Sequence, residues 1–78
     1  MAITYTKHAK EILLHRDIKQ EFADECAKNP DKTFSGDDEK KIYLKDFGKN
    51  FLKLVVLEEG GDKVIITVHW LAKRRAKL

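Results

Sequence analysis

The change of hydrophobic period at Asn29-Pro30 constrains the fold more than any other feature of this sequence. Before this dipeptide, apolar residues recur every three to four positions, as on one side of a helix. After it they alternate every two positions, as on one face of a strand. A proline disfavours the helical conformation of the residue before it, so the helical part ends at Asn29. The pattern predicts an α+β protein with its helices first.

Two short helices are expected before Asn29. Thr6 is placed to cap a helix from Lys7 to about Arg16. Asp17 is expected to cap the second helix, because Gln20 three residues later completes a capping-box pattern. The inward stripe of the first helix is predicted to hold Ala9, Ile12, Leu13 and Arg16. The buried side of the second helix is predicted to hold Ile18, Phe22, Ala23 and Cys26.

Three or four strands are expected after Pro30. Their predicted bounds are Lys32–Ser35, Lys40–Phe47, Phe51–Leu57 and Val64–Trp70. The turns between them are short, and only antiparallel neighbours can be joined in this way. The two N-terminal helices are therefore predicted to pack on a three- to four-stranded antiparallel sheet.

The last two predicted strands present one apolar face and one mixed face. The apolar face, which the helices must cover, is predicted to consist of Leu52, Leu54, Val56, Val64, Ile66, Val68 and Trp70. The opposite face is predicted to carry Phe51, Lys53, Val55, Ile65, Thr67 and His69. Because this second face is only partly polar, one interpretation is a binding surface. Tyr43 and Phe51 could stack on RNA bases, although at this spacing such aromatic residues are more often in the core.

Length and composition indicate a single small domain, residues 1–72, followed by a basic C-terminal tail, residues 73–78. No apolar stretch approaches the roughly 20 residues that cross a bilayer, and no secretory signal is expected. Cys26 is the only cysteine, which rules out an internal disulfide and favours a reducing, cytoplasmic setting. An inert buried thiol is expected there, and neither a metal site nor another cofactor is expected.

Positive charge is concentrated at the C-terminus. Residues 71–78 contain four basic residues and no acidic ones, whereas the rest of the chain carries a net charge of −1. A basic cluster suits a phosphate backbone or an acidic protein partner. A solubilising chain end is the other interpretation, and the residues alone leave both open.

His8 is a candidate catalytic residue. It is expected to be the second residue of the first helix, where the partial positive charge of the helix end disfavours imidazolium and attracts phosphate. A neutral histidine beside a phosphate can act as a general base near pH 7. A histidine that only hydrogen-bonds locally at the helix start is the alternative.

Three further positions could take part in phosphate chemistry. Arg16 falls on the inward stripe, where a guanidinium needs a carboxylate, helix carbonyls or a bound phosphate. Thr67 and His69 share the mixed face of the last strand, with Lys53 expected nearby. Together they could bind and polarise a phosphodiester. A structural salt bridge for Arg16 and an ordinary half-exposed strand for the others are the alternatives.

The order of several short motifs resembles a known family. Tyr5-Thr6-Lys7-His8-Ala9, Arg16-Asp17-Ile18, Asn29-Pro30 and the final segment Val64–Trp70 follow one another as in the bacterial and archaeal domain-of-unknown-function family numbered 4258. The resemblance extends over about residues 3–72. That family is thought to be related to BrnT and RelE toxins, which are small metal-independent ribonucleases with helices packed on an antiparallel sheet.

The resemblance implies a toxin-like ribonuclease of a toxin–antitoxin pair, in which a ribose 2′-hydroxyl attacks its own phosphate. His8 and Arg16 match the family's motifs, and Thr67 and His69 match its final strand loosely. RNA would be bound by the positions Lys45, Lys53, Lys73, Arg74 and Arg75. The partners would be RNA and an antitoxin-like protein. The alternative is a catalytically silent protein-binding module, which could act as a homodimer.

Overall fold

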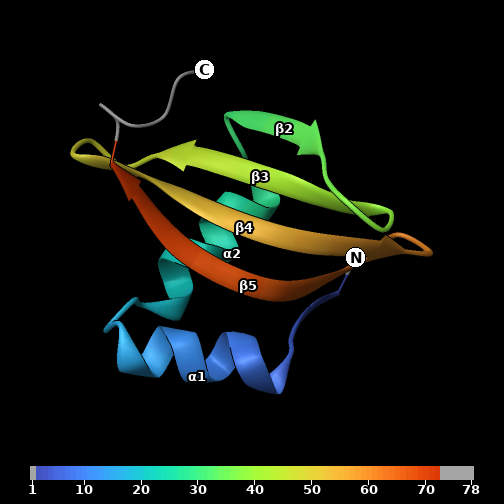
Figure 1. The fold of residues 1–78 in the computed structure, drawn as a ribbon, viewed down its shortest axis with the longest axis horizontal. Coiled ribbons are helices and arrows are strands. Elements are labelled where there is room, and N and C mark those ends of the chain that lie inside the picture. The colour runs from blue at the N-terminus through green and yellow to red at the C-terminus, as the bar shows by residue number, and fades with distance from the viewer. Residues whose placement is uncertain (1, 73–78) are drawn as a thin grey trace.

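The computed structural model describes residues 2–72, which form two helices and a five-stranded sheet (Figure 1). The elements in chain order are β1 (Ile3–Tyr5), α1 (Lys7–His15), α2 (Gln20–Lys28), β2 (Lys32–Ser35), β3 (Lys40–Asp46), β4 (Asn50–Glu59) and β5 (Asp62–Ala72). The strand order is β1-β5-β4-β3-β2. The α+β class is confirmed, but the sheet is larger than expected. It is also mixed, because β1 runs parallel to β5 while all other neighbours are antiparallel.

Strand β1 is the element that the sequence did not predict. Its three residues pair with Lys63–Ile65 of β5, and a run this short shows too little alternation to be recognised. The parallel direction is possible because both helices and three strands separate β1 from β5 along the chain, which provides the long connection that a parallel pair needs. Tyr5 at the end of β1 is 8% exposed, and its hydroxyl donates a 2.5 Å hydrogen bond to the Asp24 carboxylate on α2.

Helix α1 begins as the sequence predicted. The Thr6 hydroxyl accepts a 3.1 Å hydrogen bond from the backbone N–H of Ala9, which satisfies one of the free donors of the first turn. Ala9 and Leu13 are buried, and Ile12 packs against the core at its margin. The helix lies along the free side of β5 (Figure 1).

The turn after α1 differs from the prediction that Asp17 caps the second helix. Asp17 has φ = 52°, in the left-handed region, and its N–H donates to the carbonyl of Leu14. The N–H of Ile18 donates to the carbonyl of Leu13. These two bonds form a Schellman motif that ends α1, with Ile18 and Leu13 packed together in the core. Burial of Ile18 therefore decides the turn, and Asp17 occupies a position that usually favours glycine.

Helix α2 consequently begins later than expected, after Lys19, whose side chain makes no capping hydrogen bond. It ends at Lys28, with Asn29 as its C-cap, as the following proline predicted. Figure 1 shows it crossing behind β4 and β3. The residues that face the sheet are small, namely Ala23, Cys26 and Ala27. Phe22, predicted to be buried, is 37% exposed because it lies on the flank of this narrow contact.

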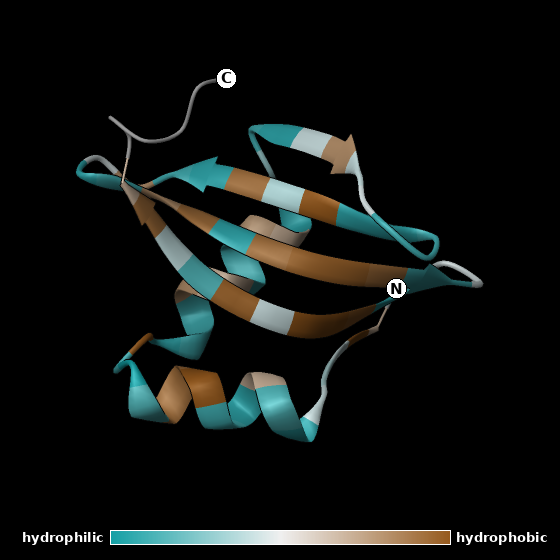
Figure 2. Cartoon of the chain, in the orientation of Figure 1, coloured by the Kyte–Doolittle hydropathy of each residue, from teal (hydrophilic) through white to brown (hydrophobic). Residues whose placement is uncertain are grey.

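The β4–β5 hairpin closes through Gly60 and Gly61, which have φ values of 54° and 85°. They lie between the paired residues Glu59 and Asp62, so the turn has two residues, and both need the positive φ that glycine adopts readily. Figure 2 shows hydrophobic residues along the middle of β4 and β5. Neither helix in the described part of the chain is long and apolar enough to cross a bilayer.

A β-bulge in β5 overturns part of the predicted buried face. Val55 is opposite Thr67, but Val56 is opposite Ile65, so Ile66 has no partner in β4. One extra residue reverses the alternation beyond it. Ile65 is therefore fully buried with the core residues of β4, whereas Val64 and Ile66, predicted to be buried there, are only partly buried. The predictions for these three positions were wrong.

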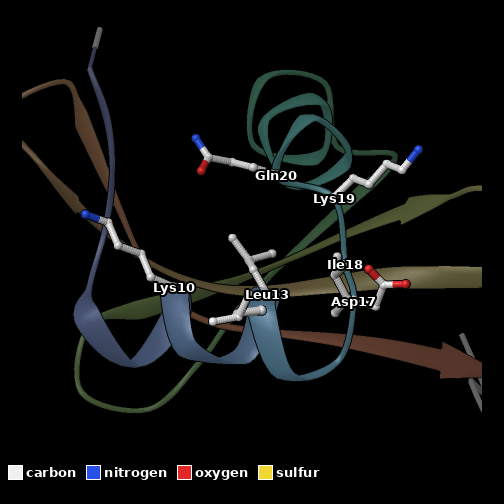
Figure 3. A pocket seen from close by; sticks show the side chains of 7 residues that line it. Lys10, Leu13, Asp17, Ile18, Lys19 and Gln20 are labelled. Carbon is white, nitrogen blue, oxygen red and sulfur yellow. The ribbon is translucent and has the colours of Figure 1, made fainter.

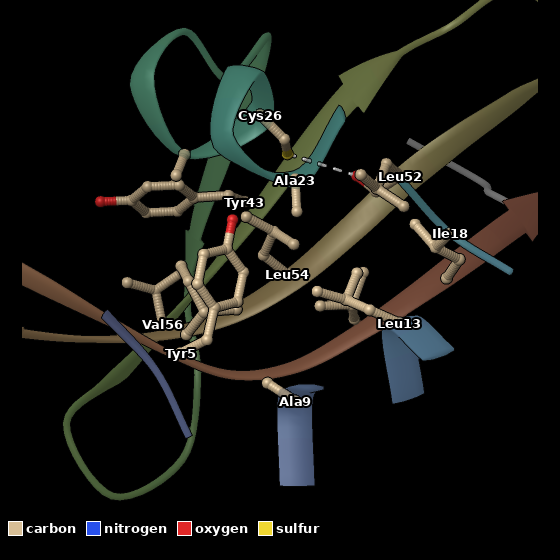
Figure 4. Close-up of a cluster of buried hydrophobic side chains, with 13 residues drawn as sticks. Tyr5, Ala9, Leu13, Ile18, Ala23, Cys26, Tyr43, Leu52, Leu54 and Val56 are labelled. Atoms are coloured by element: carbon tan, nitrogen blue, oxygen red, sulfur yellow. Dashed lines mark hydrogen bonds between the residues drawn. The ribbon is translucent and has the colours of Figure 1, made fainter. Parts of the chain in front are cut away.

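The core lies between the helices and one face of the sheet, as Figure 4 shows. Tyr43 belongs to it at 2% exposure and lies on the same face of β3 as Lys41 and Lys45. Its hydroxyl donates to Glu58 at the edge of the core, and the ammonium of Lys63 lies 4.8 Å from the centre of its ring. The opposite face of the sheet, called the open face below, is not covered by a helix (Figure 1).

Candidate functional site

The candidate site lies on the open face, where β5 is bordered by α1. Strand β1 pairs only with Lys63–Ile65, so it leaves the remainder of β5 without a neighbouring strand on that side. Helix α1, which follows β1 directly, occupies this side (Figure 1). The chain is anchored there by Thr6, whose N–H donates to the carbonyl of Ile65 at 3.1 Å and whose hydroxyl donates to that of Ile66 at 3.3 Å. This edge places α1, which carries His8 and Arg16, beside the strand that carries Thr67 and His69.

The strand contributes a histidine and a hydroxyl that touch. The Thr67 Oγ1 lies 3.3 Å from Nε2 of His69, and both side chains are partly buried. Their direct contact follows from the period of a strand, because residues two apart lie on the same face. Lys53 is directly opposite His69 in the β4–β5 ladder. The sequence correctly grouped these three residues on the open face.

The helix contributes His8 and Arg16, which are eight residues apart and therefore about 80° apart around α1. Both are exposed. Arg16 was expected to lie on the inward stripe, and this expectation was wrong. Helix α1 ends at His15, and Arg16 is its C-cap, with a backbone N–H that donates to the carbonyl of Ile12 at 2.9 Å. Arg16 therefore lies beyond the last buried turn of α1, at the end of the helix where the C-terminal carbonyls favour a cation.

Electrostatics connect the two groups of residues. Partial burial lowers the pKa of His69 below its ordinary value of 6.5, and the positive charges of Arg16, Lys53 and His8 lower it further. Among the described residues, the charges that act on His69 include no carboxylate. Within residues 2–72 neither Arg16 nor Lys53 forms an ion pair, and the pair that does form joins Lys41 to Glu58 at 3.3 Å. We call His8, Arg16, Lys53, Thr67 and His69 the cationic cluster.

The remaining predicted RNA-binding residues do not join this cluster. Lys45 is opposite Leu52, which places it on the helix-covered face, and its ammonium donates a 2.9 Å hydrogen bond to the carbonyl of Asn29. The positive charge of Lys45 thus lies at the C-terminal end of α2, where it is favourable. Lys73, Arg74 and Arg75 lie outside the described residues.

The thiol of Cys26 lies in the core. The Cys26 thiol is fully buried and donates a 3.6 Å hydrogen bond to the carbonyl of Leu52, and burial raises its pKa to about 12. Such a thiol is not a nucleophile at neutral pH. In the part of the chain that the structure describes, no three His, Cys, Asp or Glu side chains gather as a metal site would require.

The surface also has a hollow between the two helices (Figure 3). It is lined by the apolar side chains of Leu13, Leu14 and Ile18 and by the charged side chains of Lys10 and Lys19, among others. No member of the cationic cluster lines it. The cluster lies instead on an accessible edge, which suits an extended ligand better than an enclosed small molecule.

Aromatic residues near the end of β5 were not recognised as surface residues from the sequence. Phe22 and Trp70 were assigned to the buried faces, yet they are 37% and 38% exposed. Tyr43, named as a stacking candidate, is buried. Alternation gives only the face of a residue, and the exposure of Trp70 depends on how far α2 extends over that face.

No protein-family profile matches the sequence, and neither a curated protein nor a solved structure is significantly similar to the chain. The resemblance to the family numbered 4258 and to BrnT and RelE toxins therefore stays a prediction.

Proposed function

We propose that this protein is a ribonuclease that cleaves single-stranded RNA through attack of a ribose 2′-hydroxyl on the adjacent phosphate, at the cationic cluster. The observation that carries the proposal is that α1, which carries His8 and Arg16, borders β5, where His69 lies opposite Lys53 of β4 on the open face. An accumulation of positive charge on an open surface is the arrangement that attracts a phosphodiester backbone.

The electrostatic state of His69 supports the role of a general base. Its lowered pKa keeps the imidazole neutral at neutral pH, so it can accept the proton of the attacking 2′-hydroxyl. Thr67, 3.3 Å from Nε2, would hold the ring in one orientation. Arg16 and Lys53 would stabilise the charge that develops on the phosphorane. His8 would protonate the leaving 5′-oxygen, because the negative charge of a phosphodiester bound beside it favours imidazolium and offsets the effect of the helix end.

The chemistry balances without a further reactant. The bond from the 2′-oxygen to phosphorus forms as the bond from phosphorus to the 5′-oxygen breaks. One proton moves to His69 and another leaves His8. The products are a 2′,3′-cyclic phosphate and a free 5′-hydroxyl. A place in a toxin–antitoxin pair, with an antitoxin-like protein as partner, rests on the family resemblance and is part of the same proposal.

The test is cleavage of end-labelled single-stranded RNA by the purified protein in the presence of a chelator. We expect 2′,3′-cyclic phosphate ends from the wild type and losses of at least about a hundredfold for His8→Ala, Arg16→Ala and His69→Gln, a low value for lost acid–base or charge stabilisation. His15→Gln is the matched control, because His15 is the only other histidine and lies outside the cluster. Every variant is first checked for cooperative unfolding.

A protein-binding module without catalytic activity is the second candidate, favoured by the apolar residues on the open face. Phe34 is 42% exposed there, and Ile42 and Val55 are partly exposed beside it. The cleavage assay separates the two candidates. A clean wild-type protein that cuts no RNA, or variants that cut as well as wild type, would remove the ribonuclease proposal. Light scattering and affinity capture would then test for a homodimer or another protein partner.

A further inference from the structure

Three aromatic rings gather where β5 ends. Phe22 from α2, Phe47 from the β3–β4 loop and Trp70 from β5 have ring centres 5.2 to 6.3 Å apart. The two phenylalanine rings meet the indole at 65° and 89°. Neither ring therefore lies flat on the indole, and 38% of Trp70 remains exposed. A large apolar side chain is held in place here without being covered.

This aromatic group lies beside the cationic cluster. Trp70 follows His69 in β5, so their side chains leave opposite faces of the same strand end. The segment from Arg16 to Phe22 connects the two groups. It begins with a guanidinium whose charge acts on His69 and ends with a ring that contacts Trp70. A chain that passes around this end of β5 would contact the cluster on one face and the indole on the other.

We propose that Trp70, supported by Phe22 and Phe47, is a stacking site for a nucleobase of single-stranded RNA whose phosphate is held at the cationic cluster. This inference rests on the proposed function. It adds that the protein distinguishes single-stranded RNA from a polyanion without bases by stacking a base on Trp70. Stacking on an aromatic ring is the usual way in which proteins hold unpaired bases. The rigid edge-on support lowers the cost of ordering the indole on binding.

Trp70 is the only tryptophan in the chain, so its fluorescence reports this site alone. The probe is a short 2′-O-methyl RNA, which lacks the attacking hydroxyl and cannot be cleaved. The comparison is an oligomer of equal length and charge that lacks its bases. We expect the first to quench Trp70 fluorescence and to bind about 5- to 100-fold more tightly than the second, as the loss of one stacked base implies.

Variants test the same point with a labelled oligomer and fluorescence anisotropy. Trp70→Leu should weaken binding of the base-bearing oligomer about 5- to 100-fold and leave the abasic oligomer unchanged. Phe22→Leu, which keeps the indole and loses its support, should have a smaller effect in the same direction. Phe34→Leu is the matched control, since Phe34 is an exposed aromatic residue on β2 at the far edge of the sheet.

The outcomes separate this inference from the proposed function. Equal binding of both oligomers with no change in Trp70 fluorescence would overturn the stacking site and leave backbone recognition standing. Failure of both oligomers to bind at low salt would overturn the proposed function and this inference with it. Loss of binding of both oligomers in folded Trp70→Leu would also overturn the stacking site, because the indole would then act on the backbone.

Discussion

Thr67 Oγ1 lies 3.3 Å from Nε2 of His69 on the open face, just beyond the bulge in β5. Because of the bulge, Thr67 and His69 face away from the core while Ile65 remains in it. A hydroxyl at this distance can hold one tautomer and one orientation of the imidazole.

Thr67→Val, which removes the hydroxyl and keeps the shape, should lower RNA cleavage about fivefold to tenfold, the loss of one hydrogen bond in the transition state. The measurement is kcat/KM with the labelled RNA. Thr4→Val is the control, since Thr4 is an exposed threonine on the neighbouring strand β1. Equal losses in both variants would show that the Thr67 hydroxyl has no specific part in the reaction.

The lowered pKa of His69 predicts a dependence of stability on pH. The unfolded chain takes up a proton at this residue near pH 6.5, whereas the folded protein resists it, so the unfolded state binds more protons just below that pH. The free energy of unfolding should therefore fall as the pH drops below 6.5 toward the folded pKa. Urea unfolding at neutral pH and at about pH 5.5 measures this change.

His69→Gln should remove this contribution, so the variant should lose less stability on acidification than the wild type. His15→Gln serves as the control and should leave the difference unchanged. The charges around His69 make a separate prediction, which is tested by NMR titration of this histidine. Arg16→Gln and Lys53→Gln should each raise the pKa of His69, because each removes a positive charge that acts on it. A pKa of His69 that does not move in either variant would contradict the cluster itself.

The bulge predicts that two adjacent isoleucines differ in importance. Ile65 is fully buried and Ile66 is not. Ile65→Val should lower the free energy of unfolding by about 1 kcal/mol, and Ile66→Val by less than half of that. Chemical denaturation of both variants gives the comparison. The reverse order would mean that the strand is paired without the bulge, as simple alternation suggested.

The backbone conformation of Asp17 predicts that glycine at this position stabilises the protein. Its φ of 52° is strained for a residue with a side chain, and glycine is the usual occupant of this place in a Schellman motif. Asp17→Gly should raise the free energy of unfolding by about 0.5 to 1 kcal/mol. Asp37→Gly is the control, since it removes the same charge from another exposed turn without positive φ. A destabilised Asp17→Gly protein would show that the Asp17 side chain has a role of its own.

Local signals in the sequence were sufficient for much of the fold. The Thr6 cap, the stop at Asn29-Pro30 and the short turn between the last two strands each depend on residues that are close together in the chain, and each was confirmed. The grouping of Lys53, Thr67 and His69 on one face follows from the period of a strand. These features are determined by short-range sterics and hydrogen bonding.

Other features required partners that are distant in the sequence. Strand β1 exists because β5 offers it three residues to pair with, and Asp17 adopts its conformation because Ile18 is drawn into the core. Arg16 was placed on the inward stripe because its position around the helix is correct, but α1 ends one residue earlier. Periodicity describes the direction of a side chain and not the extent of the surface that covers it.

The amino-acid sequence by itself determined the class of the fold, the start of α1, the approximate strands and the candidate site residues. Only the tertiary structure decided that α1, which carries the helix residues of the cationic cluster, borders the strand that carries Thr67 and His69. The physical reason is that β1 covers three residues of β5 and no more, so that α1 lies against the remainder. Which edge of a sheet a helix borders depends on pairing across 60 residues of chain, and no local pattern encodes it.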